Sequence, residues 1–156
     1  MRKILPIDPI DRQILTELQA DGRLTITELA ERVRLSLSPC HRRLRALEAS
    51  GALVGYHARL DRRLLGLDIS AIVFVTLREV NGDAVASFET AVTRVRQVIQ
   101  AVRLFGDPDY LLHVVATDLA DFQALYDAHL SALPGVQRLS STLVMKDVVE
   151  DRPLPL

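Results

Sequence analysis

The chain has 156 residues, of which 49% are hydrophobic and 25% are charged, and its formal net charge at pH 7 is −1. This length suits one large or two small domains with a filled core, and no apolar run approaches the ~18 residues of a membrane-spanning helix. The single cysteine excludes an internal disulfide framework, so we expect a protein of the reducing cytoplasm that meets no membrane.

Charge is distributed unevenly between the two halves of the chain. Residues 1–63 contain 12 Lys and Arg against 8 Asp and Glu, whereas residues 64–156 contain 7 against 12. A basic first half and an acidic second half predict two separate tasks. A polyanion such as nucleic acid is a plausible partner for the first half.

Two short helices are predicted near the start of the chain. Asp8 is a good N-cap for a helix that begins at Pro9 and ends at Asp21-Gly22. Thr25-Ile26-Thr27-Glu28 has the pattern of a capping box and opens a second helix. Each helix has one apolar face, which predicts a small shared core.

A third helix is predicted from Ser36 to Gly51, with Ser38 as an alternative N-cap. Cys40, Leu44 and Leu47 form an apolar stripe, and Ser38, Arg42 and Arg45 lie on the opposite side. A short second helix, a tight turn and an Arg-rich third helix are typical of a helix-turn-helix that enters the DNA major groove. The alternative for the helix alone is a solvated basic face.

Alternation over Leu53–Leu60 predicts a short strand, which together with the three helices would make a winged helix. Arg59, Arg62 and Arg63 follow, and either phosphate contacts or a solvated linker would explain them. We therefore expect a helix-turn-helix DNA-binding domain at 1–52, a wing strand and linker at 53–67, and an effector-binding and dimerisation domain at 68–156.

The second half predicts the order β-α-β-β-α-β. Strands are expected at 69–77, 98–105, 110–117 and 136–149, with helices capped by Asn81 and Asp118. This is the split β-α-β, ferredoxin-like plan of an α+β fold, in which both helices cover one face of an antiparallel sheet. The strands are apolar on both alternations, so the uncovered face predicts a second copy of the chain and a two-fold dimer.

The ordered set of motifs resembles the Lrp/AsnC family of transcription regulators, also called feast/famine regulatory proteins, over about residues 8–149. The motifs that carry the resemblance include Ile10-Asp11-Arg12-Gln13-Ile14-Leu15, Asp21-Gly22-Arg23, Glu28-Leu29-Ala30, Ser38-Pro39-Cys40, Gly106-Asp107-Pro108-Asp109-Tyr110 and Leu133-Pro134-Gly135-Val136. The resemblance implies a winged helix-turn-helix joined to a ferredoxin-like (RAM) domain. It also implies dimers that assemble further, often to octamers, under the control of a small molecule, mostly an amino acid.

Two sets of site residues follow. The candidate residues for double-stranded DNA lie at the start and outer side of the third helix: Ser36, Ser38, Pro39, His41, Arg42, Arg43 and Arg45. By resemblance, the effector lies between dimers near Gly106, Asp107, Asp109, Thr142, Leu143 and Val144. Relatives that answer to leucine tend to have an aromatic residue where this chain has Thr142, so the resemblance does not extend to leucine itself.

The residues of the loop support this site by themselves only modestly. Backbone N–H groups of a Gly-Asp turn can bind a carboxylate, and an aspartate can bind an ammonium group. A plain hairpin turn with two solvated aspartates is the alternative. The sequence predicts no catalytic or metal site and no cofactor other than the effector, and the burial expected of Cys40 favours a core thiol over a redox sensor.

The function that these features predict is a sequence-specific DNA-binding transcription regulator modulated by an amino acid. The alternative is an amino-acid-binding allosteric module that uses its winged helix for protein contact. An exposed row of Ser and Arg favours DNA, because a protein-contact helix usually exposes apolar anchors.

Overall fold

The computed structural model describes residues 7–156 and divides the chain into two units. One unit comprises the described chain up to Arg59 together with Val149–Leu156, and the other comprises Leu60–Val148. Each unit is built around its own cluster of buried hydrophobic side chains. Within residues 7–156, every helix is too short or too polar to cross a bilayer.

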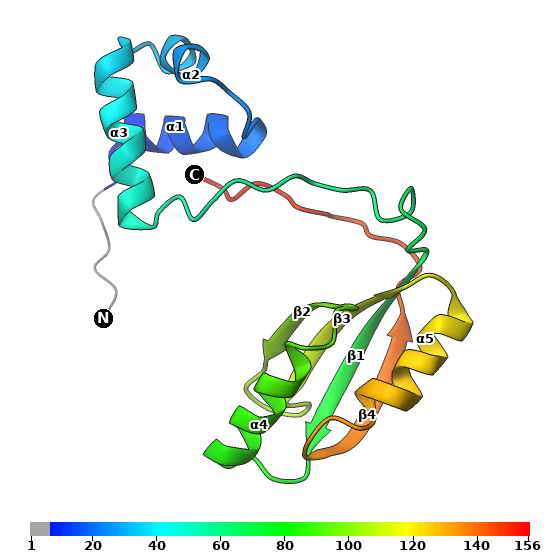
Figure 1. Ribbon diagram of the computed structural model, residues 1–156. Helices are drawn as coiled ribbons and strands as arrows, with labels where there is room; N and C mark the ends of the chain where they lie inside the picture. Colours follow the sequence, from blue (N-terminus) through cyan, green and yellow to red (C-terminus); the bar gives the residue numbers. More distant parts are fainter. Residues whose placement is uncertain (1–6) are drawn as a thin grey trace. The chain divides into compact units, whose positions relative to one another are not determined.

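The first unit contains three helices, α1 (Pro9–Ala20), α2 (Ile26–Arg32) and α3 (Leu37–Ser50) (Figure 1). The predicted caps are confirmed: the Asp8 carboxylate accepts from the Asp11 backbone N–H at 2.8 Å, and Thr25 caps α2 in a capping box. The core contains the fully buried Ile14 and Cys40. Burial raises the pKa of the Cys40 thiol, which fits a core residue.

The strand predicted over Leu53–Leu60 does not form in the single chain. The Leu53 N–H donates to the Leu47 carbonyl, but within residues 7–156 no hydrogen-bonded ladder joins the rest of this segment to a second one. A strand needs a partner for its backbone groups, and alternation alone does not supply one. The segment is extended, and Val54 and Leu60 on it are exposed.

The C-terminal segment returns to the first unit. Arg59 forms ion pairs with Glu150 at 2.8 Å and with Asp151 at 3.2 Å. Near the end of the chain, the Leu154 N–H donates to the Gln19 side chain at 2.7 Å, and the Gln19 amide donates back to the Leu154 carbonyl. Figure 1 shows this segment running beside residues 52–59 toward α1. The first unit is therefore made from two separate stretches of the chain.

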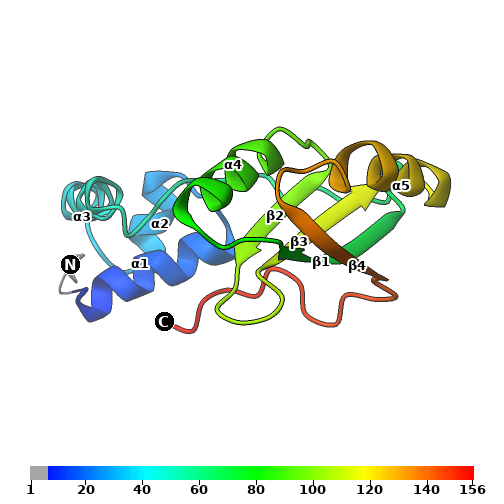
Figure 2. The same ribbon diagram turned by 90° about the horizontal axis from the view of Figure 1, so that it is seen from below.

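The second unit is a four-stranded antiparallel sheet with helices on one face. Its elements are β1 (Ile69–Leu77), α4 (Gly82–Val92), β2 (Val98–Arg103), β3 (Tyr110–Ala116), α5 (Leu119–Leu125), a π-helical turn (Tyr126–Leu130) and β4 (Val136–Leu143). The strand order is β2-β3-β1-β4, which confirms the predicted ferredoxin-like plan. Figure 2 shows α4 and α5 lying on the same side of the sheet.

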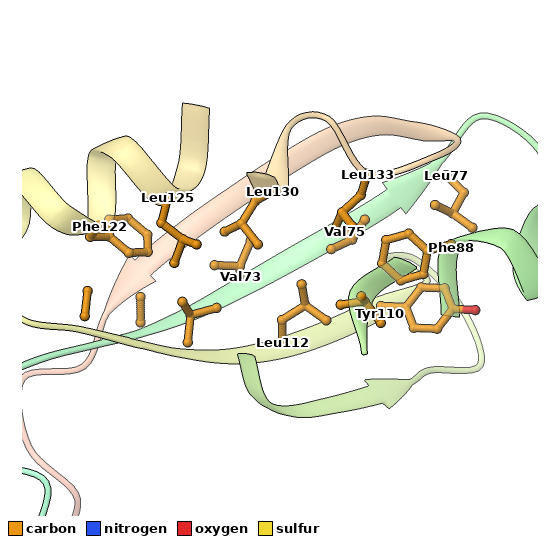
Figure 3. Packing of buried hydrophobic residues seen from close by; sticks show 14 residues of the cluster. Val73, Val75, Leu77, Phe88, Tyr110, Leu112, Phe122, Leu125, Leu130 and Leu133 are labelled. Carbon is orange, nitrogen blue, oxygen red and sulfur yellow. The ribbon is translucent and has the colours of Figure 1, made fainter. Parts of the chain in front are cut away.

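The core of this unit lies between the sheet and the two helices (Figure 3). Val73 and Val75 of β1 and Leu112 of β3 are fully buried and face Phe88 of α4 and Leu125 of α5. The Phe88 and Tyr110 rings lie with their centroids 4.5 Å apart. Burial and a hydrogen bond to Glu89 at 2.9 Å raise the pKa of Tyr110 to about 12, so its hydroxyl stays protonated.

The opposite face of the sheet is not covered by helices. Ile72 and Phe74 on β1 and Leu111 on β3 lie on this face and are only half-buried. Ser70 of β1 and its partner Val115 of β3 are buried on this face, and the Ser70 hydroxyl lies 2.7 Å from Nε2 of His113. The predicted strand 136–149 is shorter than expected, because β4 ends at Leu143, where its pairing with Ala71 of β1 ends.

Candidate functional site

The outer row of α3 is the candidate surface in the first unit. The helix begins after its predicted cap, Ser36, whose side chain makes no capping hydrogen bond. A tight turn precedes it, in which the Leu35 N–H donates to the Ala30 carbonyl at 2.9 Å and Arg34 has a φ of 55°. Burial of Cys40 and Leu47 fixes the inner side of the helix, so the opposite side faces solvent.

Most of the candidate DNA-contacting side chains lie on this outer row. The exposed members are Ser36, Ser38, His41, Arg42 and Arg45, and Pro39 is half-buried. Arg45 forms a loose ion pair with Glu48 at 3.4 Å, with 69% of its side chain exposed. Arg42 makes no ion pair within the described residues. The row offers exposed guanidinium groups and small hydroxyls, which are the groups that read base edges and phosphates in DNA grooves.

Arg43 is positioned differently from the other candidates. Its Nη1 atom lies 2.6 Å from the Asp8 carboxylate and 2.9 Å from the Asp11 carboxylate. Hydrogen bonds to the Asp11 backbone and to Arg43 hold the pKa of Asp8 below its usual range, and the two carboxylates raise the pKa of Arg43. Arg43 thus ties α3 to the start of α1, and a phosphate contact would require it to leave these partners.

The arginines that follow the extended segment also have acidic partners. Arg59 pairs with Glu150 and Asp151 in the first unit, and Arg62 lies 3.1 Å from Asp147 in the second unit. Phosphate contacts by Arg59 or Arg62 would therefore compete with carboxylates of the same chain. This competition was not foreseen from the sequence.

The loop between β2 and β3 is the candidate surface in the second unit. Gly106 has a φ of +134°, a conformation that side-chain-bearing residues rarely adopt, so glycine suits this position. Asp109 is held firmly: its carboxylate accepts from the Leu77 N–H at 2.7 Å, and its own N–H donates to the Val75 carbonyl at 2.9 Å. Asp109 therefore anchors the loop to the end of β1.

Asp107, in contrast, extends over the open face of the sheet. The Thr76 hydroxyl donates to Oδ1 of Asp107 at 3.2 Å. Nη2 of Arg138 lies 3.4 Å from the same oxygen, 3.5 Å from Oδ2 and 3.4 Å from the Thr76 hydroxyl. We call these three residues the loop triad. Strand pairing brings two of them together, because Thr76 and Arg138 are partners across β1 and β4.

A hollow of about 470 Å³ lies at the loop triad. Besides the triad, it is lined by Phe74, Pro108, Leu139 and Ser140. A second hollow of about 480 Å³ lies on the other side of the loop and is lined by Val80, Arg103, Leu104, Phe105, Gly106 and Asp109. Both volumes are in the range of small-ligand sites. The loop therefore separates two concave surfaces, one with an Arg and an Asp side by side.

The structure brings only part of the predicted effector set together. Gly106, Asp107 and Asp109 line the two hollows, whereas Thr142, Leu143 and Val144 line neither of them. Thr142 pairs with Ile72 on the open face, further along the sheet from the loop. Phe74, Thr76 and Arg138 also line the first hollow and were not among the predicted site residues. The alternation of Phe74 and Thr76 with Ile72 along β1 could have placed them on the open face of the sheet. It could not show that the β2–β3 loop lies over that face.

Comparisons with known proteins find relatives for both units of the chain. Residues 7–54 match the family model described as winged helix-turn-helix DNA-binding, and residues 70–154 match the Lrp/AsnC ligand binding domain. The chain is 41% identical over 143 residues to the Bkd operon transcriptional regulator of Pseudomonas aeruginosa, covering 92% of this chain and 94% of that protein.

Two further relatives extend the likeness. The leucine-responsive regulatory protein of Escherichia coli K12 is 37% identical over 148 residues, covering 95% of this chain and 90% of that protein. The crystal structure of a transcriptional regulator from Neisseria meningitidis in complex with L-Met superimposes with a TM-score of 0.90 at 38% identity, covering 95% of this chain and 96% of that one.

Proposed function

Because this chain belongs to the Lrp/AsnC family of transcriptional regulators, we propose that α3 reads DNA in the major groove and that the β2–β3 loop binds an amino-acid effector. DNA binding and regulation by an effector are the family's function. The residues that perform them here, the effector and the assembly are the proposal. The exposed row of Ser38, Arg42 and Arg45 opposite a buried stripe is the observation that carries the DNA-reading part.

The DNA-reading surface is tested by selection from a random duplex library with the full-length protein. We expect enrichment of a near-palindromic sequence whose half-sites are one helical turn apart or a multiple of it, ~34 Å per turn, because a two-fold dimer presents two equivalent helices. Non-specific retention should fall with rising salt as counterion release becomes less favourable. Retention without any sequence enrichment would count against base reading by α3.

Assembly through the open face of the sheet supports such a dimer. Ile72 and Leu111 present apolar side chains that no helix of the second unit covers. A second copy packed face to face would bury them, and dimers would join further, up to octamers, through contacts near the loop. Sedimentation of the full-length protein should show a species larger than a monomer, and Ile72→Asp should shift it toward the monomer because the dimer would bury an unpaired charge. An unchanged distribution would contradict this face as the interface.

The effector proposal rests on the loop and its two hollows. The relative from Neisseria meningitidis was crystallised with L-Met, and the loop triad of this chain offers both an Asp and an Arg beside a concave surface. We therefore infer an amino-acid effector that shifts assembly or DNA affinity through its different affinity for two states. A screen of the proteinogenic amino acids for changes in melting temperature, oligomer distribution and DNA affinity tests this, and no response to any of them would refute it.

The remaining expectations follow from this role. The relatives named above are bacterial, and a bacterial protein that binds chromosomal DNA acts in the cytoplasm, so we propose a cytoplasmic protein. Its chemistry is binding, so we expect no catalytic activity and no cofactor other than the effector. Both units thus serve one reversible regulatory task.

A further inference from the structure

The loop triad contains a weak ion pair, between Arg138 and Asp107, which lies beside a ligand-sized hollow. Its Arg–Asp distances are 3.4 and 3.5 Å, and the Arg138 and Asp107 side chains are 64% and 72% exposed. Charge-assisted hydrogen bonds are usually about 2.7–2.9 Å long, and exposed ion pairs contribute little to stability. Arg43, at 2.6 and 2.9 Å from its two carboxylates, is the tight counterpart in this chain. The loop triad can therefore open at small cost.

The arginine of the triad has unused binding capacity. A guanidinium group carries five N–H donors in a rigid fork that matches a carboxylate. Within the described residues, only Nη2 of Arg138 contacts acceptors, namely the Asp107 carboxylate and the Thr76 hydroxyl. A carboxylate that approached Arg138 could accept two parallel hydrogen bonds, which Asp107 does not make in its present position.

The hollow carries one positive and one negative side chain, Arg138 and Asp107, and this favours a ligand that carries both charges. A ligand with a single charge would replace the Arg138–Asp107 contact with one new ion pair and leave the other charge without a partner. A zwitterion would replace one weak pair with two, the ammonium on Asp107 and the carboxylate on Arg138. The rest of the lining includes the apolar Phe74 and Pro108, which suit an apolar side chain, and the polar Ser140.

From these observations we propose that Arg138 is the carboxylate-binding residue of the effector site. An effector enters by exchanging the Arg138–Asp107 ion pair for two ion pairs of its own. The ligand class is a zwitterionic amino acid with an apolar side chain, and amines or carboxylates that lack the second charge bind more weakly. This inference rests on the proposed amino-acid effector at the β2–β3 loop and assigns the residue that recognises its carboxylate.

The test compares L-methionine with L-methioninamide, which keeps the ammonium and lacks the carboxylate. Isothermal titration calorimetry on the full-length protein should give about tenfold or tighter affinity for L-methionine. In Arg138→Gln, the affinity for L-methionine should fall by about tenfold or more. The affinity for L-methioninamide should stay the same or rise, because Asp107 no longer has Arg138 as a partner. The preference between the two probes should therefore disappear.

Three controls keep the test specific. Arg94→Gln removes the same charge from an exposed position of the second unit that lines neither hollow beside the loop, and it should leave both affinities unchanged. Arg138→Lys keeps the positive charge and should keep part of the preference for L-methionine. Thermal unfolding of each variant shows that it is folded when titrated.

The possible outcomes distinguish a failure of the Arg138 inference from a failure of the proposed effector function. If L-methionine binds equally well to the parent and to Arg138→Gln, or if the parent binds L-methioninamide as tightly, Arg138 does not recognise the carboxylate and the inference is overturned while the proposed effector function stands. If neither L-methionine nor another proteinogenic amino acid binds the parent, the proposed function fails and the inference fails with it. If another amino acid binds instead, that amino acid and its amide replace the two probes in the same comparison.

Discussion

The two candidate sites are assembled in different ways. The candidate DNA-reading row of α3 lies on one continuous helix, and the burial of Cys40 and Leu47 orients all of its members at once. The loop triad is assembled from β1, the β2–β3 loop and β4, and its members meet only because the sheet pairs Thr76 with Arg138 and the loop folds over them. A site on one helix depends on that helix and the small core that orients it, whereas a site made from three segments depends on the whole sheet.

The core of the second unit should show this dependence most strongly. Phe88 is fully buried against Tyr110, so Phe88→Ala should lower the free energy of unfolding of this unit by about 3–5 kcal/mol. Effector binding should be lost with it, whereas the helices of the first unit should stay folded. Denaturant unfolding followed by circular dichroism, with effector titration, measures both effects.

Phe105→Ala is the matched control for the loss of stability only, because Phe105 is an aromatic residue of the same unit with a fully exposed side chain but lines one hollow beside the loop. Its stability should change by about 0.5 kcal/mol or less. If Phe88→Ala also unfolded the helices of the first unit, the two units would not fold independently, and the α3 row would depend on the sheet as well.

An intermediate effect is expected on the outer row of α3. Arg42→Ala or Arg45→Ala should weaken specific DNA binding by about 1–3 kcal/mol if the side chain reads a base. Neither residue is on the buried stripe, so the melting temperature and effector affinity should hardly change. Fluorescence anisotropy with the selected duplex measures the loss, and Arg94→Ala serves as the charge control. Unchanged affinity in both variants would remove α3 from the role of recognition helix.

The smallest expected effect is a loss of stability of the first unit at low pH. It distinguishes Arg43, which is paired with carboxylates, from the exposed Arg42 and Arg45 on the same helix. The pKa of Asp8 is lowered by the Asp11 backbone and by Arg43, and the pKa of Glu28 is lowered by its capping contacts with Thr25. Both carboxylates therefore stabilise the first unit fully above their unfolded pKa values, near 4, and lose this contribution as the pH falls through the lower folded values.

Thermal unfolding of the first unit between about pH 5 and pH 2 measures this loss. Asp8→Asn should flatten the dependence, and Arg43→Ala should lower the melting temperature near neutral pH and also flatten it. Because Arg43 then acts as a clamp between α1 and α3, the Arg43→Ala variant should bind DNA worse only in proportion to its unfolded fraction. A large loss of affinity in fully folded Arg43→Ala would assign this residue to DNA contact after all.

Much of the architecture could be predicted because it depends on local patterns. The caps Asp8, Thr25 and Asn81 follow from residue types beside apolar periodicity, and all three cap the expected helices. The strand order follows from the β-α-β-β-α-β succession, which leaves few unknotted arrangements. The strand over Leu53–Leu60 was predicted from alternation, which describes a single segment. Alternation does not show whether a second strand is available to pair with it, and in the single chain none is found within residues 7–156.

The site residues show the same difference between local patterns and contacts from distant segments. Arg42 and Arg45 were placed correctly on the exposed side because periodicity fixes directions around one helix. Arg43 was assigned to DNA along with them, but its partners lie more than 30 residues earlier in the chain. Arg138 was missed because its neighbour Asp107 arrives from a loop 31 residues away, and no local pattern predicts that contact.

The return of Val149–Leu156 to the first unit has a practical consequence for recombination between relatives. A chimera that exchanges only the N-terminal stretch would combine one parent's Gln19 and Arg59 with the other parent's C-terminal segment, whose Glu150, Asp151 and Leu154 positions contact them here. A faithful transplant of the first unit therefore needs two crossovers, one after Arg59 and one before Val149, with both stretches taken from the same parent.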